Sequence, residues 1–187
     1  ASKYAQRKSK VVSVTEKEGR SGKLGFVLVR HEYYQDDHHI LSEETDIVYK
    51  QTPKSETTVA KVNATLSTPT KTPQWSETIK PSPVLLFKYS ALTFNGHRIH
   101  YDRDFCKNNF GFPGLVVQGP LLATLLIELI RKNMSDATVL EYSFRIKGPI
   151  FDFQTFKVEG CREGDVVSLW AVNDSGLETV SARAGIK

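Results

Sequence analysis

The segment that most constrains the fold is GPLLATLLIELIRKN, residues 119–133, because it reads as a helix with apolar residues on almost every side. Pro120 suits a first turn, where a missing N–H costs nothing, and Arg131 and Lys132 occupy the last turn before Asn133 ends the pattern. Its apolar positions are Leu121, Leu122, Leu125, Leu126, Ile127, Leu129 and Ile130. A helix of this kind must be enclosed by other structure, so we predict a central helix wrapped by the rest of its domain.

Strand-forming patterns, rich in Val, Ile, Phe and Tyr, provide the enclosing structure. They are predicted at residues 10–18, 24–34, 39–50 and 84–90, and after the helix at 138–147, 154–161, 165–172 and 177–186. Short connections between successive strands favour antiparallel meanders. The expected fold class is therefore α+β, with a curved antiparallel sheet around the central helix.

The composition divides the chain into three parts. Residues 51–83 are rich in Thr, Ser, Lys and Pro and have no apolar period, which predicts a linker. Residues 84–187 contain the central helix with strands on both sides of it. Residues 1–50 provide three comparable strands without such a helix, so they read as the latter strands of a second unit of the same kind.

Composition also narrows the function classes. The net charge is +4, and residues 1–30 hold eight Lys and Arg against two Glu, but these charges alternate with apolar residues as on solvated strand faces. Nucleic-acid binding is therefore disfavoured. The longest apolar run, residues 115–130, is too interrupted to span a membrane, and no targeting segment is assigned. Cys106 and Cys161 are too few for a disulfide framework and suit a reducing compartment.

Within ALTFNGHRIHYDRDF, residues 91–105, six hydrogen-bonding or titrating residues fall in the eight positions 95–102: Asn95, His97, Arg98, His100, Tyr101 and Asp102. Since this cluster precedes the central helix, we expect it near the helix's amino end, where free N–H groups face a ligand. Gly119 has no side chain to block that backbone, and its N–H could stabilise a carbonyl oxygen that gains charge. His100 titrates near neutral pH and could move a proton. The cluster therefore favours proton removal beside a carbonyl, or addition of water to a conjugated double bond.

Other chemistries fit the cluster less well. His97, His100 and Asp102 could chelate a metal, but no histidine follows His100 to complete the ligand set of an iron site. Neither cysteine nor any serine has a neighbouring base that would make it a nucleophile. Asp102 is more readily explained as the cap of a short helix in YDRDFCKN. Whether His97 acts on a ligand or on buried backbone groups stays open, as does the choice between solvent and phosphate for Arg98.

The motifs NGHRIHYD and GFPGLVVQGPLLATLL resemble the hotdog-fold MaoC-like hydratases and dehydratases of acyl thioesters. That family's signature is D-x-N-P-[IL]-H-x-D before the enclosed helix, and residues 99–102 match I-H-x-D. Gly119 matches the family's glycine whose N–H contributes to the oxyanion hole. Asn95 falls where the family usually has a catalytic Asp, and His97 and Arg98 replace its Asn and Pro. This form is similar to that of mesaconyl- and itaconyl-CoA hydratases and of the yeast-type mitochondrial 3-hydroxyacyl-thioester dehydratase.

The resemblance implies a double hotdog whose amino-terminal half is incomplete here, with one more strand–helix opening before residue 1. It also implies a hydro-lyase that interconverts a 2-enoyl thioester and water with a 3-hydroxyacyl thioester. His100 would shuttle the proton, Asn95 would hold the water and the Gly119 N–H would polarise the thioester carbonyl. An amide cannot accept a proton at neutral pH, so Asn95 leaves one catalytic role unfilled. The alternative is a non-catalytic hotdog protein that binds acyl thioesters or serves as a scaffold.

The expected ligand is an acyl-CoA or an acyl carrier protein thioester, with no cofactor beyond the CoA or phosphopantetheine of that substrate. Candidate substrate-binding residues are His97, Arg98, Tyr101, Gln118, Arg103 and Lys88, of which Lys88 and the two arginines would contact phosphates. No metal, nucleic-acid partner or membrane span is expected, and a second copy or a partner chain could supply the missing hotdog elements. Mitochondrial placement follows from the resemblance alone, with the cytoplasm as the alternative.

Overall fold

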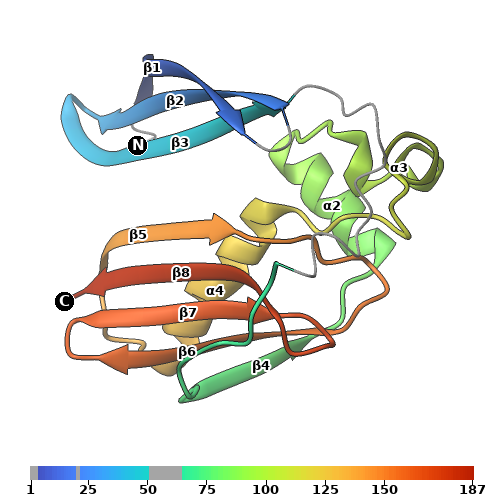
Figure 1. Ribbon diagram of the computed structural model, residues 1–187. Coiled ribbons are helices and arrows are strands. Elements are labelled where there is room, and N and C mark those ends of the chain that lie inside the picture. Colours follow the sequence, from blue (N-terminus) through green and yellow to red (C-terminus); the bar gives the residue numbers. More distant parts are fainter. Residues whose placement is uncertain (1–3, 20–21, 51–64) are drawn as a thin grey trace. The chain divides into compact units, whose positions relative to one another are not determined.

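The computed structural model describes residues 4–19, 22–50 and 65–187. The chain forms two compact units, Ala1–Ser55 and Glu56–Lys187, and each is described here by itself (Figure 1).

The first unit is a three-stranded antiparallel sheet in the order β1-β2-β3. Its strands are β1 (Ala5–Gly19), β2 (Gly22–Gln35) and β3 (His38–Lys50). These strands confirm the three predicted from residues 10–50. Asp36 and Asp37 connect β2 to β3 and have φ values of 48° and 62°, a left-handed pair that suits a two-residue hairpin turn.

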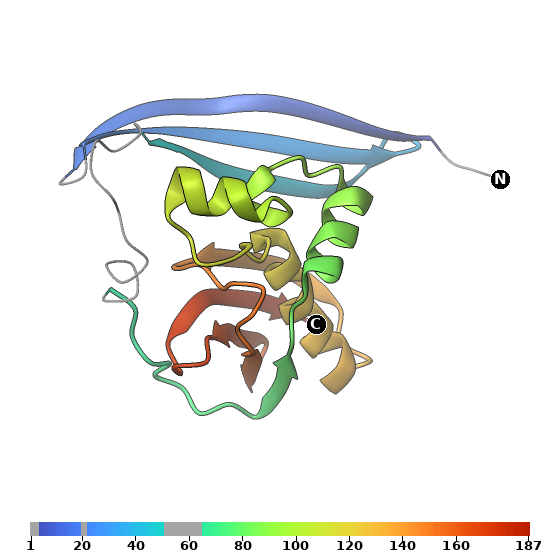
Figure 2. The same ribbon diagram turned by 90° about the vertical axis from the view of Figure 1, so that its right-hand side faces the viewer.

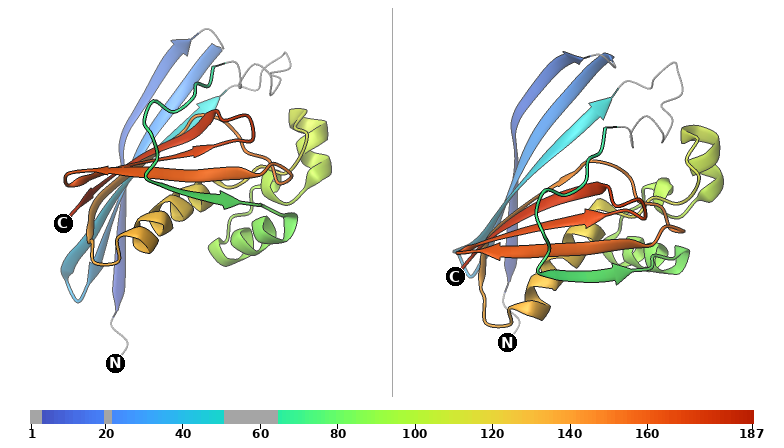
Figure 3. Two further views of the ribbon diagram at one scale, coloured as in Figure 1. Left: turned by 90° about the horizontal axis from the view of Figure 1, so that it is seen from below. Right: turned by 60° about the horizontal axis from the view of Figure 1, so that its bottom comes forward.

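The second unit contains a five-stranded antiparallel sheet in the order β4-β6-β7-β8-β5. Its strands are β4 (Trp75–Ile79), β5 (Val139–Ile146), β6 (Phe156–Glu163), β7 (Val166–Val172) and β8 (Glu178–Ile186). Helix α4 (Gly119–Asn133) lies across one face of this sheet (Figures 1 and 3). The α+β class and the sheet wrapped around a helix are confirmed, and the bounds of α4 are those predicted.

The core of the second unit lies between α4 and the sheet. The buried residues of α4 are Leu121, Leu122, Ala123, Leu126, Leu129 and Ile130. They cluster with every second residue of the central strands, such as Val167, Leu169 and Ala171 of β7. This period of two is the signature of a strand with one face on the core. Ile127 is 37% exposed, so the helix is enclosed on most of its circumference rather than all of it.

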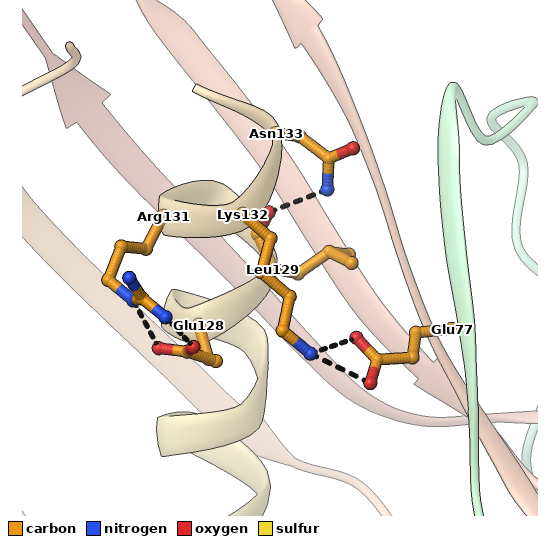
Figure 4. A network of polar contacts seen from close by, with 6 residues as sticks. All are labelled: Glu77, Glu128, Leu129, Arg131, Lys132 and Asn133. Carbon is orange, nitrogen blue, oxygen red and sulfur yellow. Dashed lines mark hydrogen bonds and ion pairs between the residues drawn. The ribbon is translucent and has the colours of Figure 1, made fainter. Parts of the chain in front are cut away.

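At the carboxyl end of α4, one polar contact joins the helix to strand β4 at the edge of the sheet, and two others lie within the helix (Figure 4). Lys132 Nζ donates to both carboxylate oxygens of Glu77 on β4, at 2.9 and 2.8 Å, and Arg131 Nε donates to Glu128 at 2.8 Å. Asn133 Nδ2 donates to the carbonyl of Leu129 at 2.8 Å. Basic side chains here also offset the negative end of the helix dipole. Exposed pairs of this kind contribute at most about 1 kcal/mol each, so most of the stability of the helix comes from its buried face.

The strand predicted at residues 84–90 is wrong, because this segment lies within helix α2 (Pro83–Thr93). Ser82 Oγ caps it by accepting a hydrogen bond from the Leu85 N–H at 3.2 Å, and Pro83 occupies the first turn. This Ser-Pro start favours a helix over the strand that the apolar run alone suggests. Leu86 and Ser90 are its buried residues, while Phe87 is 61% exposed.

The linker predicted at residues 51–83 is too long. Strand β4 lies inside this predicted linker and pairs with β6. Along β4 the partly buried residues Trp75 and Glu77 alternate with exposed ones, as in a strand with one face toward the core. Ser67 is also bound to the sheet, because its carbonyl accepts from the Glu178 N–H at 2.8 Å. Residues 51–64 lie outside the described residues.

Candidate functional site

The predicted polar cluster lies in the connection between α2 and α3 (Arg103–Phe110), which includes the short 3₁₀ helix η1 (Arg98–His100). Helices α2 and α3 lie toward the amino end of α4 (Figures 1 and 2). Helix α2 ends at Thr93, and the next residue, Phe94, has a φ of 54° that turns the chain out of the helix. The Asn95 N–H then donates to the carbonyl of Ser90 at 2.9 Å.

Asn95 is held by its own turn. Its Oδ1 accepts a hydrogen bond from the His97 N–H at 3.1 Å, the local bond by which Asn side chains commonly stabilise turns. Asn95 is half-buried. Among the residues that the structure describes, nothing accepts from its side-chain NH₂, so this group is available as a donor to a ligand.

His100 is buried, with 6% of its surface exposed, and its ring orientation is fixed. Nδ1 lies 2.7 Å from the carbonyl oxygen of Val116, which can only accept, so Nδ1 carries the hydrogen. In the neutral ring, Nε2 therefore holds the lone pair. Burial lowers the pKa of His100 below its usual 6.5, the bond to Val116 opposes this, and nearby His97 adds to the lowering. His100 is thus a neutral base at pH 7.

Backbone hydrogen bonds lock the segment that orients His100. The Val116 N–H donates to the carbonyl of Ile99 at 2.9 Å, and the Val117 N–H donates to the carbonyl of Ile150 at 2.8 Å. Val116 also forms a β-bridge with Phe151. His100 and its acceptor are therefore placed by the same short stretch of chain, which leads directly into α4.

The amino end of α4 has no side-chain cap. Gln118 occupies the capping position but makes no capping hydrogen bond, and Pro120 has no N–H. In the described part of the chain nothing accepts from the Gly119 N–H, so it is available at the positive end of the helix dipole. The side chain of Ile146 packs against Gly119, where its carbons would lie 3.3 Å from an added Cβ.

The Gln118 side chain is fully buried and turned toward α2. Its Nε2 donates to the carbonyl of Leu86 at 2.7 Å and to Ser90 Oγ at 3.0 Å. Its Oε1 is buried and has no hydrogen-bond partner among the described residues. Gln118 thus joins the amino end of α4 to the helix that precedes Asn95.

Asp102 is the cap of α3, as predicted, because its Oδ1 accepts from the Phe105 N–H at 2.9 Å. Its Oδ2 accepts from Arg98 Nε and Nη2 at 3.0 and 2.7 Å, and the Arg98 guanidinium lies 4.2 Å from the Phe105 ring centroid. The Phe105 N–H, and then Arg98, hold the pKa of Asp102 below its usual value. Arg98 is therefore bound to its own turn, and a contact between Arg98 and a phosphate stays a prediction.

Arg103 forms an ion pair that the sequence reasoning missed. Its Nη2 lies 2.5 Å from Oδ2 of Asp152, a carboxylate that is 5% exposed. Asp152 Oδ1 also accepts from the Leu115 N–H at 2.9 Å. The lone acid in GPIFDF was the available signal, since an acid in an apolar context is buried only when it is paired. Arg103 is thus engaged in holding this loop together.

The remaining candidates are exposed. The ring of His97 stacks on that of His100, with centroids 6.3 Å apart and planes 14° apart. Tyr101 is 43% exposed, and its hydroxyl donates to the carbonyl of Gly96 at 3.0 Å. Lys88 is exposed on α2 rather than on a strand.

Among the described residues, no three His, Cys, Asp or Glu side chains come together as a metal site would need. Cys106 is buried, its Sγ donates to the carbonyl of Ile99 at 3.1 Å, and burial raises the pKa of its thiol, so it is not an activated nucleophile. No helix in the described part of the chain is long and apolar enough to cross a membrane.

Comparison with known proteins identifies relatives of the chain. It is 41% identical over 182 residues to the mesaconyl-C(4)-CoA hydratase of Chloroflexus aurantiacus, and the match covers 95% of this chain and 62% of the relative. It is 31% identical over 139 residues to the mitochondrial hydroxyacyl-thioester dehydratase type 2 of Schizosaccharomyces pombe, covering 71% of this chain and 43% of the relative. The chain therefore spans less than two thirds of either relative.

A solved structure shares the fold. The MaoC-like dehydratase of Phytophthora capsici superposes with a TM-score of 0.70 at 15% identity, covering 97% of this chain and 61% of that one. The expected hotdog fold is confirmed. In addition, the sequence profile of hydroxyacyl-thioester dehydratase type 2 matches residues 1–152. The chain belongs to the hydroxyacyl-thioester dehydratase type 2 family.

Proposed function

We propose that this protein is a hydro-lyase that reversibly adds water to a 2-enoyl thioester to form a 3-hydroxyacyl thioester. The observation that carries the proposal is the fixed tautomer of His100, whose Nδ1 donates to the carbonyl of Val116 and leaves Nε2 as a base. Val116 lies three residues before Gly119, where a helix begins with an available N–H. A base and an oxyanion donor held by one segment are the two groups that conjugate addition of water needs.

The geometry supports the following steps. The Gly119 N–H binds the thioester carbonyl oxygen and draws electron density from C3. Water attacks C3 while His100 Nε2 takes one of its protons, and the same nitrogen then returns that proton to C2. One O–H bond and the C2–C3 π bond break, and C3–O and C2–H bonds form, so no other reactant is needed. An oxyanion donor of this type contributes about 10²–10³ in rate, and acid–base catalysis about 10²–10⁴.

Asn95 changes how this site works. Its Oδ1 already accepts one hydrogen bond, from the His97 N–H, and an amide does not accept a proton at neutral pH. We therefore assign all proton transfer to His100 and leave Asn95 its free NH₂ as a donor to bound water or substrate. The predicted substrate contacts stay His97, Arg98, Tyr101, Gln118, Arg103 and Lys88.

The acyl group is proposed from the relatives. Because the relative at 41% identity is named as a mesaconyl-C(4)-CoA hydratase, we propose a branched C4-dicarboxylic enoyl-CoA ahead of a straight-chain substrate. The test is loss of the enoyl-thioester absorbance on a panel of mesaconyl-C(4)-CoA, crotonyl-CoA and crotonyl carrier protein. Hydration of at least one thioester supports the reaction, and its ranking assigns the substrate. No hydration of any of them at high enzyme concentration contradicts the proposal.

The second candidate is a non-catalytic protein that binds acyl thioesters, favoured by the amide of Asn95 where the family usually has a carboxylate. Calorimetry with the same thioesters separates the two. Binding without turnover, together with a gain of turnover in Asn95→Asp, would support the non-catalytic candidate.

Two further points are proposed with the function. Residues 1–50 are the latter strands of an amino-terminal hotdog half, and residues 84–187 are the carboxy-terminal hotdog that carries the active site. The fission yeast relative is named as mitochondrial, and we propose the same compartment here, with the cytoplasm as the alternative.

A further inference from the structure

A hollow of about 310 Å³ lies over the paired strands β5 and β8 of the second unit. Figure 1 shows these two strands side by side, with α4 behind the sheet. The residues that line the hollow are Ser143, Phe144, Arg145, Ser181, Ala182 and Arg183. Its volume lies at the lower end of the range for small-molecule sites, about 300–1,000 Å³.

The alternation of the two strands decides which side chains point into the hollow. The Tyr142 hydroxyl donates to the carbonyl of Ala123 on α4 at 2.9 Å, so Tyr142 and every second residue of β5 face the helix. On β8, Ala182 and Ala184 belong to the core on that same side. The lining side chains on the opposite face of the sheet are therefore Ser143, Arg145, Ser181 and Arg183.

The register of the strands brings the two arginines close together. Ser143 lies opposite Arg183, and Arg145 lies opposite Ser181. The two arginines are therefore diagonal neighbours, whose positions in an antiparallel pair are about 7–8 Å apart, within reach of long side chains. Two positive charges at this separation repel each other, and an anion bound between them would offset the repulsion.

Arg145 and Arg183 differ from the other arginines of residues 65–187. Four of the six arginines in this range are bound, three by acids and one by a carbonyl, namely Arg98, Arg103, Arg131 and Arg162. Arg145 and Arg183 are exposed, and no described residue forms an ion pair or hydrogen bond with either side chain. Glu141 is on the same face, but its carboxylate lies over Gly185, where Oε2 is 3.6 Å from the position of an added Cβ. Both guanidinium groups are thus available to a ligand.

We propose that Arg145 and Arg183 bind a phosphate group of a small molecule, with the hydroxyls of Ser143 and Ser181 as further donors. A guanidinium donates two parallel hydrogen bonds to a pair of phosphate oxygens, and the opposite charges strengthen both bonds. This site is separate from the proposed catalytic residues, because Ile146, which packs against Gly119, faces the other side of β5. The phosphate belongs either to the CoA of a thioester or to a separate phosphorylated molecule, and the measurements below distinguish these sources.

The first test uses pyrophosphate as the probe. Calorimetry of the unmodified protein should show saturable binding, and Arg145→Gln and Arg183→Gln should each weaken it about tenfold or more, because each removes a charged donor. The matched control is Arg131→Gln, which removes the same charge from α4 on the other side of the sheet and should keep the affinity within about twofold. No saturable binding at millimolar pyrophosphate, or equal weakening in all three variants, would overturn the proposal.

Thermal unfolding gives a second measurement and shows whether the variants fold. Since a ligand stabilises the state that binds it, pyrophosphate should raise the Tm of the unmodified protein but not that of the double variant Arg145→Gln/Arg183→Gln. Both arginines are exposed, so the double variant should unfold near the Tm of the unmodified protein when no ligand is present. Equal stabilisation of both proteins by pyrophosphate would contradict the site.

The source of the phosphate is tested with crotonyl-CoA and crotonyl-pantetheine, which has no phosphate. If the double variant raises KM about fivefold or more for the CoA thioester alone, the site binds the CoA of the substrate. If it changes neither KM but loses pyrophosphate binding, the site takes a separate phosphorylated molecule. The binding measurements need no turnover, so they test this inference even if the protein hydrates no thioester and the proposed function fails.

Discussion

The substitution His100→Asn separates the two roles of the ring. The Nδ2 of an asparagine lies close to the position of Nδ1 in histidine, so it can still donate to the carbonyl of Val116, now 2.7 Å from Nδ1. No atom of asparagine replaces Nε2, so the proposed base is lost. The matched variant is His100→Ala, which removes both the base and the donor.

The expected magnitudes differ between activity and stability. Loss of acid–base catalysis should lower kcat by about 10²–10⁴, which is roughly 2.7–5.4 kcal/mol of activation free energy at about 1.36 kcal/mol per tenfold. His100→Ala also leaves the part-buried carbonyl of Val116 without its donor, which costs about 1–3 kcal/mol of unfolding free energy. His100→Asn should avoid most of that cost. The two variants should therefore be about equally inactive but unequally stable.

Turnover is followed by the enoyl-thioester absorbance, and unfolding free energy by denaturant titration of each variant. Activity of His100→Asn within tenfold of the unmodified protein would refute the assignment of Nε2 as the base. Equal stabilities of the two variants would instead refute the argument that the Val116 carbonyl fixes the ring.

Three other outcomes follow from the same geometry. Burial lowers the pKa of His100 in the folded protein, so as the pH falls below about 6.5 the unfolded chain binds this proton before the folded chain does. The free energy of unfolding should therefore decrease by at most about 1.4 kcal/mol per pH unit until the native pKa is reached. Denaturant titrations between about pH 5 and 7 should show a smaller slope for His100→Asn. The acid limb of kcat should likewise lie below pH 6.5, and an acid limb above it would contradict a buried neutral base. Gly119→Ala keeps the N–H but adds a Cβ to the backbone that the thioester must approach, so it should lower kcat about tenfold or more. Thermal stability should change little, since the half-exposed Ile146 can give way by a few tenths of an ångström. Unchanged turnover would contradict a close approach of the thioester to the backbone at residue 119. Leu126→Ala, at a fully buried position, should cost about 2–5 kcal/mol in denaturant unfolding, against less than about 1 kcal/mol for its partly exposed neighbour Ile127→Ala, and similar losses would mean that α4 is not enclosed as described.

Local patterns were sufficient where one interaction dominates. The bounds of α4 were predicted because Pro120 marks its first turn and the basic residues mark its last turn. Its burial was predicted because apolar residues on most sides of a helix must pack against other structure. The strands after it alternate with a period of two, which a sheet with one buried face imposes. The capping role of Asp102 was also predictable, since it needs only residues three positions away.

The errors arose where the decisive partner is distant in sequence. Residues 84–90 are apolar enough for either a strand or a helix, and the packing of Leu86 and Ser90 against Gln118 is a tertiary contact. Strand β4 was hidden in a Thr-rich segment because its stability comes from pairing with β6, about 80 residues later. The partner of Arg103 was missed for the same reason, as Asp152 is 49 residues away.

The sequence by itself determined the enclosed helix, the alternating strands, and the residue types of the site, because these depend on periodicity and on chemistry within a few positions. Only the tertiary structure decided which nitrogen of His100 carries the hydrogen, that Arg103 pairs with Asp152, and that an oxygen of Gln118 is buried without a partner among the described residues. Those properties depend on directed hydrogen bonds and on exclusion of water, and both exist only after segments far apart in the chain have packed together.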